Sequence, residues 1–198
     1  TKTRGHREPW PGGRTNHYYH DLNRDWCWQT QKETQDRIKL YNQWMPHVHV
    51  DYHEQSYNDP YYFAPAVEPY HELITSWQKE FQQIIGKNNA DNFDEKQLLY
   101  FTNEEFDLLY PGFGDTYPIF NGAIGMTYEK GGSGAGGVAV RTSAMDTLTL
   151  KERLEHHYLT GLATVEATFE NSERVIREFQ SFFKNANSNP PGKYKTFI

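Results

Sequence analysis

Polar and apolar residues alternate from Val48 to Glu54, and this pattern predicts a short β-strand with two unlike faces. One face carries titratable or charged side chains, at His47, His49, Asp51 and His53. The other face is apolar, at Val48, Val50 and Tyr52. A histidine at the carboxyl end of a sheet strand is well placed to bind a metal or to act as a general base. We therefore expect chemistry at the His53 end of this strand.

A second apolar run, over residues 121–129, predicts another strand that ends on the carboxylate of Glu129. A glutamate at a strand end is ordinarily solvated, so this position alone indicates no function. The glycine-rich segment that follows, 131–137, lacks the Lys-Ser/Thr pair of a phosphate-binding loop. It is predicted to be a flexible connector.

Apolar residues at helical spacing predict helices over about 29–44, 70–85 and 149–184. Pro46 follows the first helix, and Gly86 takes the C′ position of the second. The third opens with the capping box Thr149-x-x-Glu152 and carries an expected break near Asn171. Its apolar stripe is predicted to be buried, at Leu150, Leu154, Tyr158, Leu162, Val165, Phe169, Ile176, Phe179 and Phe183.

The remaining segments are expected to be mostly irregular. Residues 1–25 are predicted to form a Pro/Gly loop, and the Tyr- and Pro-rich segment 56–69 is predicted to lie over a cleft. Residues 87–94 are interpreted as a polar connector, and 103–107 as a short helix. The segment 185–198 is predicted to be a tail or linker, so one domain is expected over residues 1–184.

Composition narrows the possible classes of protein. No apolar run approaches the eighteen or so residues that a membrane span needs. A net charge of -6, without a basic cluster, argues against a nucleic-acid partner. The lone Cys27 excludes an internal disulfide.

The tetrapeptide Asp21-Leu22-Asn23-Arg24 is suited to hold a carboxylate. The guanidinium of Arg24 can bind a carboxylate through two parallel hydrogen bonds, and the Asn23 amide can donate beside it. Asp21 could fix the orientation of either side chain. A surface turn with a salt bridge fits the same residues, because Asn and Asp are ordinary turn formers.

The order of these features resembles the zinc carboxypeptidase family that includes carboxypeptidase A. The resemblance spans roughly residues 9–180, and its most specific stretch, residues 8–26, is similar to a bacterial branch of the family. It implies an α/β fold of the phosphorylase/hydrolase-like kind, in which helices flank both faces of a mixed sheet. The implied activity is zinc-dependent removal of C-terminal residues from peptides.

The resemblance also implies a role for each motif residue. Asn23 and Arg24 would bind the C-terminal carboxylate of the peptide substrate. His53 would be the third zinc ligand, and Glu129 the general base. Zinc in such a site keeps an open position for water, whose pKa falls towards about 7.

Two further roles are less closely fixed by the sequence. The family has a mobile tyrosine that covers the substrate, which matches Tyr110 best and Tyr117 as an alternative. It also has a second arginine that polarises the scissile carbonyl. Arg14 is the preferred match, and Arg4 remains open.

One departure from the family is serious. The first two zinc ligands of the family come from a His-x-x-Glu motif before the Asn-Arg pair, and no His here has Glu three positions later. We therefore expect an N-terminally truncated enzyme whose missing N-terminal part carries those two ligands and is its natural partner. The chain alone is predicted to bind zinc weakly and to be inactive. Family members of this branch are commonly exported, so export to the periplasm or the extracellular space is expected.

Two other functions remain open. The spacing His47-x-His49-x-Asp51-x-His53 resembles the ligand set of metallo-β-lactamase-like hydrolases, although its last interval is one residue too long. A non-catalytic module that binds peptides or glycans could also keep Arg24 and lose zinc. A peptidase needs Glu129, a strand-based metal site needs His47 and His49, and a binding module needs none of the three.

Overall fold

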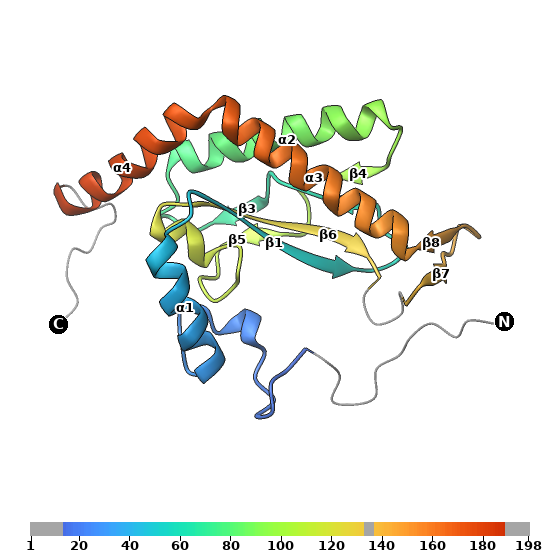
Figure 1. Cartoon of the computed structure of the whole chain (residues 1–198), viewed down its shortest axis with the longest axis horizontal. Coiled ribbons are helices and arrows are strands. Elements are labelled where there is room, and N and C mark those ends of the chain that lie inside the picture. The colour runs from blue at the N-terminus through green and yellow to red at the C-terminus, as the bar shows by residue number, and fades with distance from the viewer. Residues whose placement is uncertain (1–13, 133–136, 189–198) are drawn as a thin grey trace.

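A four-stranded mixed sheet forms the centre of this computed structural model, which describes residues 14–132 and 137–188 (Figure 1). The strand order is β1 (Val48–Gln55), β6 (Ile124–Gly131), β2 (Tyr61–Tyr62) and β4 (Tyr100–Phe101). β1 and β6 pair in parallel along their whole length, whereas β2 is antiparallel to β6 and parallel to β4. The predicted α/β class with a mixed sheet is confirmed.

Two small sheets flank the central one. β3 (Val67–Tyr70) pairs with β5 (Asp107–Leu108), and β7 (Ala139–Arg141) pairs with β8 (Thr147–Thr149). The predictions of an irregular 56–69 segment and a short helix at 103–107 were therefore wrong in part, since β2, β3 and the start of β5 lie there.

Aromatic packing explains these short strands. The side chain of Tyr62 is 1% exposed, and its ring lies 5.2 Å from Phe101 and 4.4 Å from Phe106. Contacts between residues far apart in sequence thus hold segments whose local sequence indicates loops.

Helices cover both faces of the central sheet (Figure 1). α1 (Lys32–Trp44) and the short 3₁₀ helix η1 (Leu22–Arg24) lie on one side. α2 (Ser76–Glu95) and α3 (Leu150–Glu170) pack on the other. α4 (Ser172–Ser188) continues beyond α3 after the predicted break at Asn171. The 3₁₀ helix η2 (Tyr117–Asn121) leads into β6.

The predicted boundaries of α2 were wrong. The helix begins after Thr75, whose side chain forms a capping box with Gln78, and it runs through Gly86 as far as Glu95. Gly86 is buried inside the helix, where a Cβ atom would collide with the main-chain oxygen of Ala64. It therefore serves a close approach of two backbones and does not end the helix.

The end of α4 also differs from prediction. The helix continues to Ser188, so the first four residues of the predicted tail are helical. Residues 189–198, the rest of that tail, lie outside the described residues, as does Arg4.

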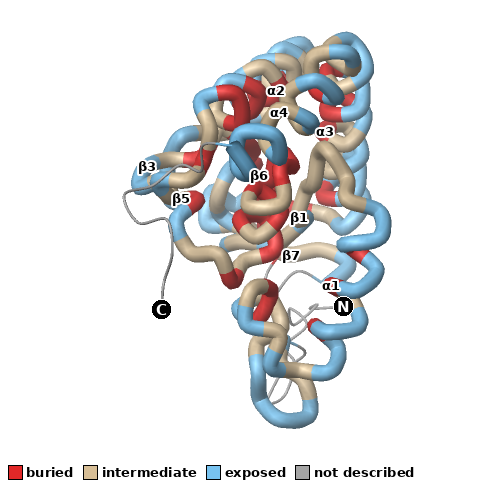
Figure 2. Tube along the Cα trace, turned by 90° about the vertical axis from the view of Figure 1, so that its left-hand side faces the viewer, coloured by how far each residue is buried: buried red, intermediate tan, exposed pale blue. Residues whose placement is uncertain are grey.

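The main core lies between the sheet and the helices α2 and α3. In Figure 2 the buried residues gather around β6 and the adjoining turns of α2. α3 contributes small residues to this core, namely Thr160, Ala163, Thr164 and Ala167. Its large apolar residues point away, and the prediction that they form a buried stripe was wrong: Tyr158 is 69% exposed and Phe169 is 79% exposed.

No helix within residues 14–132 and 137–188 is long and apolar enough to cross a membrane.

Candidate functional site

A polar cleft of about 390 Å³ lies at the carboxyl ends of β1 and β6. Its walls come from the turn around η1, the two strands, the segment 105–107 at the start of β5, and the loop that precedes η2. Of the residues predicted for the site, five line this cleft: Arg14, Asn23, Arg24, His53 and Glu129. The sixth, Tyr110, does not line it. The structure therefore brings together side chains that are widely separated in the sequence.

His53 and Glu129 are cross-strand neighbours. They occupy the same register position of the parallel pair β1 and β6. Glu129 also pairs with Tyr62 of β2, so its backbone is enclosed on both sides. The side chain of Glu129 is 7% exposed, which excludes the ordinary solvated state of a strand-end glutamate.

Burial raises the pKa of the Glu129 carboxyl to about 7, although the nearby His53 acts in the opposite direction. The hydroxyl of Thr127 lies 3.2 Å from Glu129 Oε1 and 3.1 Å from the main-chain oxygen of Asp51. A carboxyl with a pKa near neutrality can exchange a proton with a reacting group at physiological pH. This is the property that a general base requires.

Asp51 holds the imidazole of His53. Its Oδ2 atom lies 2.7 Å from His53 Nε2, and this hydrogen bond raises the pKa of His53 above its ordinary value. Asn23 Nδ2 lies 2.8 Å from the same ring nitrogen. One nitrogen cannot donate to Asp51 and accept from Asn23 at once, so the charge on Asp51 favours the tautomer with the proton on Nε2. The lone pair on Nδ1 is then left for a metal ion.

Asn23 is the centre of this network. Its Nδ2 donates to Asp51 Oδ2 at 3.0 Å, and its Oδ1 accepts from Trp26 Nε1 at 2.9 Å and from the backbone N–H of Gly114 at 2.8 Å. The amide thus orients Asp51, which in turn holds His53, and this role differs from the predicted contact with a substrate carboxylate. Such a contact would require the amide to exchange one of these partners.

The two arginines of the cleft share one carboxylate. Asp21 Oδ2 accepts from Arg14 Nε at 2.7 Å and lies 3.9 Å from Arg24 Nη1, and Asp21 Oδ1 accepts from the backbone N–H of Asn23. Asp21 therefore fixes the guanidinium of Arg14 by a hydrogen bond, whereas Arg24 donates from Nη1 to the main-chain oxygen of Asn23 at 2.9 Å and is attracted by the Asp21 charge. Half of each arginine side chain is exposed, which leaves donors free for an anion.

The loop before η2 contacts Arg24 through two aromatic side chains. The Arg24 guanidinium lies 4.3 Å from the centre of the Phe113 ring, and Tyr110 donates its hydroxyl hydrogen to the main-chain oxygen of Arg24 at 3.1 Å. The Tyr110 hydroxyl also accepts from Trp28 Nε1 at 2.7 Å. Tyr110 is held beside the cleft in this arrangement, and Tyr117 packs instead against Trp26, with 5.8 Å between the ring centres.

Gly114 allows this loop to approach the network. A Cβ atom there would lie 2.5 Å from Asp51 Oδ2 and 2.8 Å from Asn23 Oδ1. No side chain fits at that position without displacing the two polar groups. The glycine is a local signal that sequence reasoning passed over.

Asp115 is a second residue that the sequence did not indicate. Its carboxyl lines the cleft and is only 6% exposed, and burial raises its pKa to about 6. Asp51 was noted only as a member of the polar face of its strand. Both residues add negative charge beside Glu129, and a cationic group in the cleft would relieve their repulsion.

His47 and His49 do not join His53 in the cleft. The His49 ring is enclosed by Trp26 and Tyr41, with centre distances of 5.6 Å and 5.8 Å, and burial lowers its pKa. The His47 ring packs against Phe179 of α4 at 4.1 Å. Both histidines have aromatic neighbours in place of further metal ligands.

His53 is the residue that the sequence predicts to be a metal ligand. The imidazole of His53, oriented through Nε2 by a carboxylate, has the arrangement typical of a zinc ligand. No group of three or more His, Cys, Asp or Glu side chains within the described ranges could hold a metal ion. A complete site at His53 would need two ligands from polypeptide that is not described.

No protein-family model, no curated protein and no solved structure matches this chain.

Proposed function

We propose that this chain carries the substrate-binding and proton-transfer half of a zinc-dependent carboxypeptidase. One observation supports this above all: His53 and Glu129 stand in register at the carboxyl ends of adjacent parallel strands, facing a cleft that Arg14 and Arg24 also line. A metal ligand, a base near neutral pKa and an anion site are the parts that C-terminal peptide hydrolysis needs.

Each residue has a distinct task in this proposal. Arg24, fixed by Asp21 and Phe113, binds the C-terminal carboxylate of the substrate. Arg14 lies on the same wall and donates to the scissile carbonyl as negative charge develops on its oxygen, a contribution of about 3 kcal/mol. Glu129 removes the proton from the attacking water and delivers it to the leaving amine. Tyr110 closes over the bound substrate after its hydroxyl leaves the main chain of Arg24.

His53 would hold the metal, while Asp51 accepts the Nε2 hydrogen and fixes the ring. Zinc, when bound, would supply a Lewis acid that polarises water and carbonyl oxygens. The two remaining ligands are proposed to lie on an N-terminal part of the same enzyme. The specific carboxypeptidase-like fold and export from the cell belong to this proposal as well.

A carboxylate-binding experiment tests the substrate site without metal. A short peptide with a free C-terminal carboxylate and its C-terminal amide are titrated into the zinc-free chain, and affinities are measured by calorimetry. We expect the acid to bind on the order of tenfold more tightly than the amide, since a bidentate contact with Arg24 is lost in the amide. Arg24→Gln should remove the difference. Lys32→Gln, which changes an exposed cation on α1, is the matched control.

The proposed division of the zinc ligands is tested by measuring how much zinc the chain retains after equilibration with zinc and desalting. We expect the chain alone to retain far less than one zinc per molecule, and His53→Ala to retain less still. One tightly held zinc per chain would mean that a complete site exists in these 198 residues, which contradicts the proposed division of ligands. Peptidase turnover by the chain alone would contradict it equally. Equal binding of acid and amide would exclude a carboxypeptidase.

The variant Glu129→Gln distinguishes the proposed enzyme from the non-catalytic alternative, a module that only binds peptides. A peptide-binding module would discriminate acid from amide just as well but would not gain turnover when its zinc ligands are completed. Loss of that turnover in Glu129→Gln, with peptide affinity unchanged, distinguishes the enzyme from the module.

A further inference from the structure

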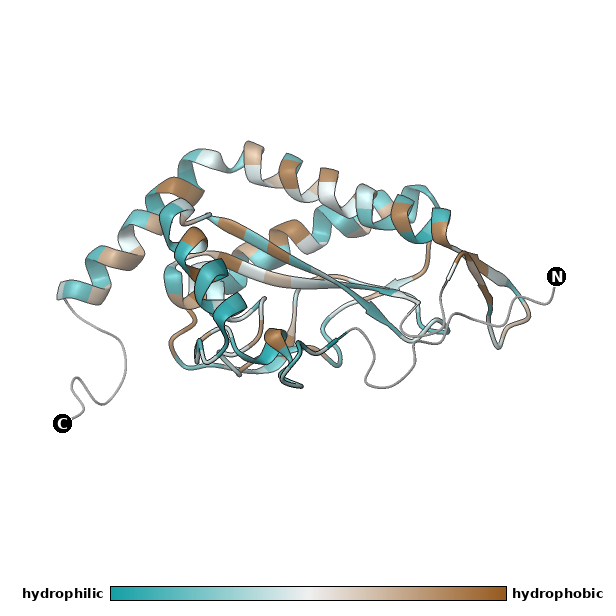
Figure 3. Ribbon diagram, turned by 60° about the horizontal axis from the view of Figure 1, so that its bottom comes forward, coloured by the Kyte–Doolittle hydropathy of each residue, from teal (hydrophilic) through white to brown (hydrophobic). Residues whose placement is uncertain are grey.

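α3 has apolar residues on two sides. Its small residues pack inward, whereas large residues at intervals of three or four positions form a stripe on its outer side (Figure 3). These large residues make up the α3 stripe: Leu154 is 59% exposed, Tyr158 69%, Leu162 51%, Val165 66% and Phe169 79%. A helix that is apolar on both sides is normally enclosed on both sides. We therefore expect a partner to cover the α3 stripe.

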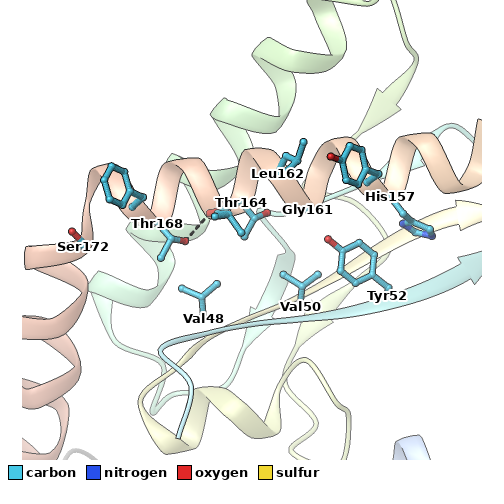
Figure 4. Close-up of a pocket in the computed structure, with 12 residues that line it drawn as sticks. Val48, Val50, Tyr52, His157, Gly161, Leu162, Thr164, Thr168 and Ser172 are labelled. Atoms are coloured by element: carbon cyan, nitrogen blue, oxygen red, sulfur yellow. Dashed lines mark hydrogen bonds between the residues drawn. The ribbon is translucent and has the colours of Figure 1, made fainter. Parts of the chain in front are cut away.

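A groove beside the stripe extends the apolar surface onto β1 (Figure 4). It has a volume of about 760 Å³, and Val48, Val50 and Tyr52 point into it from β1. Gly161 and Thr164 of α3 face these side chains, and every stripe residue after the first also lines the groove. Within the described part of the chain no Asp, Glu, Lys or Arg lines it. Its occupant must therefore present an apolar surface.

The combined area suits a specific protein interface. Five large side chains that each expose on the order of 100 Å² give the stripe about 500 Å² of apolar surface. With the β1 side of the groove, the area approaches the ~800 Å² that each partner contributes to an interface of standard size. An exposed apolar patch of this size indicates an interaction site.

The stripe is complementary to itself when its direction is reversed. In a two-fold dimer, if one residue contacts a second residue across the interface, the second contacts the first in return. An antiparallel pair of α3 helices, with the axis beside Gly161, gives every large residue an apolar position to face. The facing pairs are Leu154 with Phe169, Tyr158 with Val165, and Leu162 with Gly161. Only the Tyr52 hydroxyl lies close to the place of a Cβ atom at Gly161, so the leucine has room there.

Charges at the ends of the stripe favour the antiparallel arrangement. Lys151 precedes the stripe, where it also lies 3.5 Å from Glu155, and Glu170 and Glu173 follow the stripe. Antiparallel pairing brings Lys151 of one copy towards the acidic end of the other. A parallel pair would place the two acidic ends side by side, where like charges repel. The stripe itself contains no charged residue.

We infer that the α3 stripe and the groove join two copies of this chain in an antiparallel, two-fold dimer. A second copy is favoured over an unrelated protein because the reversed stripe supplies the large residues, the small central residue and the uncharged surface that this face requires. His53 and Glu129 alternate along their strands with the residues that face α3, so the cleft lies on the other face of the sheet. Both clefts stay open in the dimer, which does not depend on the proposed function.

Sedimentation equilibrium of the whole chain in EDTA tests the dimer. A reductant is present, so that no disulfide forms through Cys27. We expect the mass to rise from 23.2 kDa towards twice that value as the protein concentration is raised through the micromolar range. The mass should rise no further, because a closed two-fold interface uses the same surface of both copies.

Leu162→Glu tests the centre of the interface. The change places two carboxylates close together beside the two-fold axis, so the dissociation constant of the dimer should rise by on the order of tenfold or more. Leu99→Glu is the matched control, because Leu99 is 80% exposed and lies outside the stripe and the groove. Circular dichroism verifies that each variant is folded.

A pair of opposite charges tests the register of the two helices. Tyr158→Glu and Val165→Lys should each weaken the dimer, because each encloses a charge that has no partner. The double variant should dimerise on the order of tenfold more tightly than either single variant, since each introduced carboxylate then faces an introduced ammonium group of the other copy. Tyr158→Glu with Phe169→Lys should show no such recovery, because those two positions do not face each other.

Four results would overturn the inference. A chain that stays monomeric through the micromolar range would assign the surface to a different occupant. Association that continues beyond two copies would show an open contact in place of a two-fold one. Equal effects of Leu162→Glu and Leu99→Glu would place the interface away from the α3 stripe. Equal affinities of the two double variants would exclude the antiparallel register.

Discussion

His53 and Glu129 occupy the same register position on two hydrogen-bonded parallel strands, so the proposed metal ligand and the proposed base are fixed relative to each other by backbone geometry. Neither depends on a flexible loop for its position. Sites built on strands hold their groups more closely than sites built on loops. The arginines that face them are different, because Arg14 is held by Asp21 of a turn and Arg24 by the main-chain oxygen of Asn23 in the same turn.

Asp51→Asn should lower the pKa of His53 in the zinc-free chain. The hydrogen bond from His53 to Asp51 is the main reason that this pKa lies above its ordinary value of 6.5, and an amide accepts that bond without supplying a charge. The titration is followed by the NMR signal of the His53 ring. Asp36→Asn, an exposed change on α1, should leave the curve in place. An unchanged pKa in Asp51→Asn would show that Asp51 does not hold the ring.

Glu129→Gln should stabilise the metal-free chain at neutral pH. The folded-state pKa of Glu129 is about 7 against an ordinary value of 4.5, so between these values the folded state keeps a proton that the unfolded state has lost. Stability therefore falls as pH rises, by up to about 1.4 kcal/mol per pH unit and about 3 kcal/mol in total. Glutamine has no ionisable carboxyl, so Glu129→Gln does not lose stability in this way as pH rises.

Urea denaturation at several pH values in EDTA measures the effect. The difference between Glu129→Gln and wild type should be small below pH 4.5 and grow towards pH 7. Glu170→Gln, at an exposed position on α3, should follow wild type at every pH. A difference that does not vary with pH would mean that the Glu129 carboxyl is not held in its neutral form.

Gly114→Ala should disturb the cleft more than a glycine-to-alanine change elsewhere. The added methyl would lie 2.5 Å from Asp51 Oδ2, and displacing that network should cost about 1–3 kcal/mol. Gly161→Ala in α3 is the comparison, since its one close neighbour is the hydroxyl of the partly exposed Tyr52, and alanine favours a helix by roughly 0.5–1 kcal/mol. The midpoint temperature of thermal unfolding should be higher for Gly161→Ala than for wild type, and lower for Gly114→Ala.

Local patterns were sufficient to predict one strand that carries the site and the start of one long helix. Alternation located β1 and assigned its two faces, and the capping box located the start of α3. Both signals depend on neighbouring residues only. The short strands β2 and β5 escaped prediction because contacts between distant aromatic rings hold them, as those of Tyr62 do.

The exposed stripe of α3 was missed for a different reason. A hydrophobic period indicates that a face will be covered, but it does not say by what. In the same way, Asn23 was identified as a site residue from its turn, whereas its bonds to Trp26 and Gly114 depend on how the chain returns to the turn. Asp115 gave no signal, since its pKa is set by burial that only the fold creates.

Asp21→Asn separates orientation from charge in the anion site. The change removes a negative charge beside the cleft, which strengthens the attraction of a peptide carboxylate at long range. It also weakens the hydrogen bond that orients Arg14 and removes the charge that attracts Arg24, so these side chains lose more freedom when they bind the carboxylate. Because exposed ion pairs are worth at most about 1 kcal/mol, we expect affinity for a free C-terminal carboxylate to fall by about two- to fivefold at moderate salt.

The dependence of carboxylate affinity on salt concentration distinguishes long-range attraction from the orientation of the arginines. Attraction at long range is screened with a Debye length of about 8 Å at physiological ionic strength, whereas a bidentate contact is not. The affinity of Asp21→Asn for the carboxylate should therefore decline more steeply with salt than that of wild type. The difference in affinity between the two proteins should grow as salt is added. Calorimetric titrations at a series of salt concentrations measure both slopes. If Asp21→Asn binds the carboxylate more tightly than wild type at every salt concentration, Asp21 does not orient the arginines for binding.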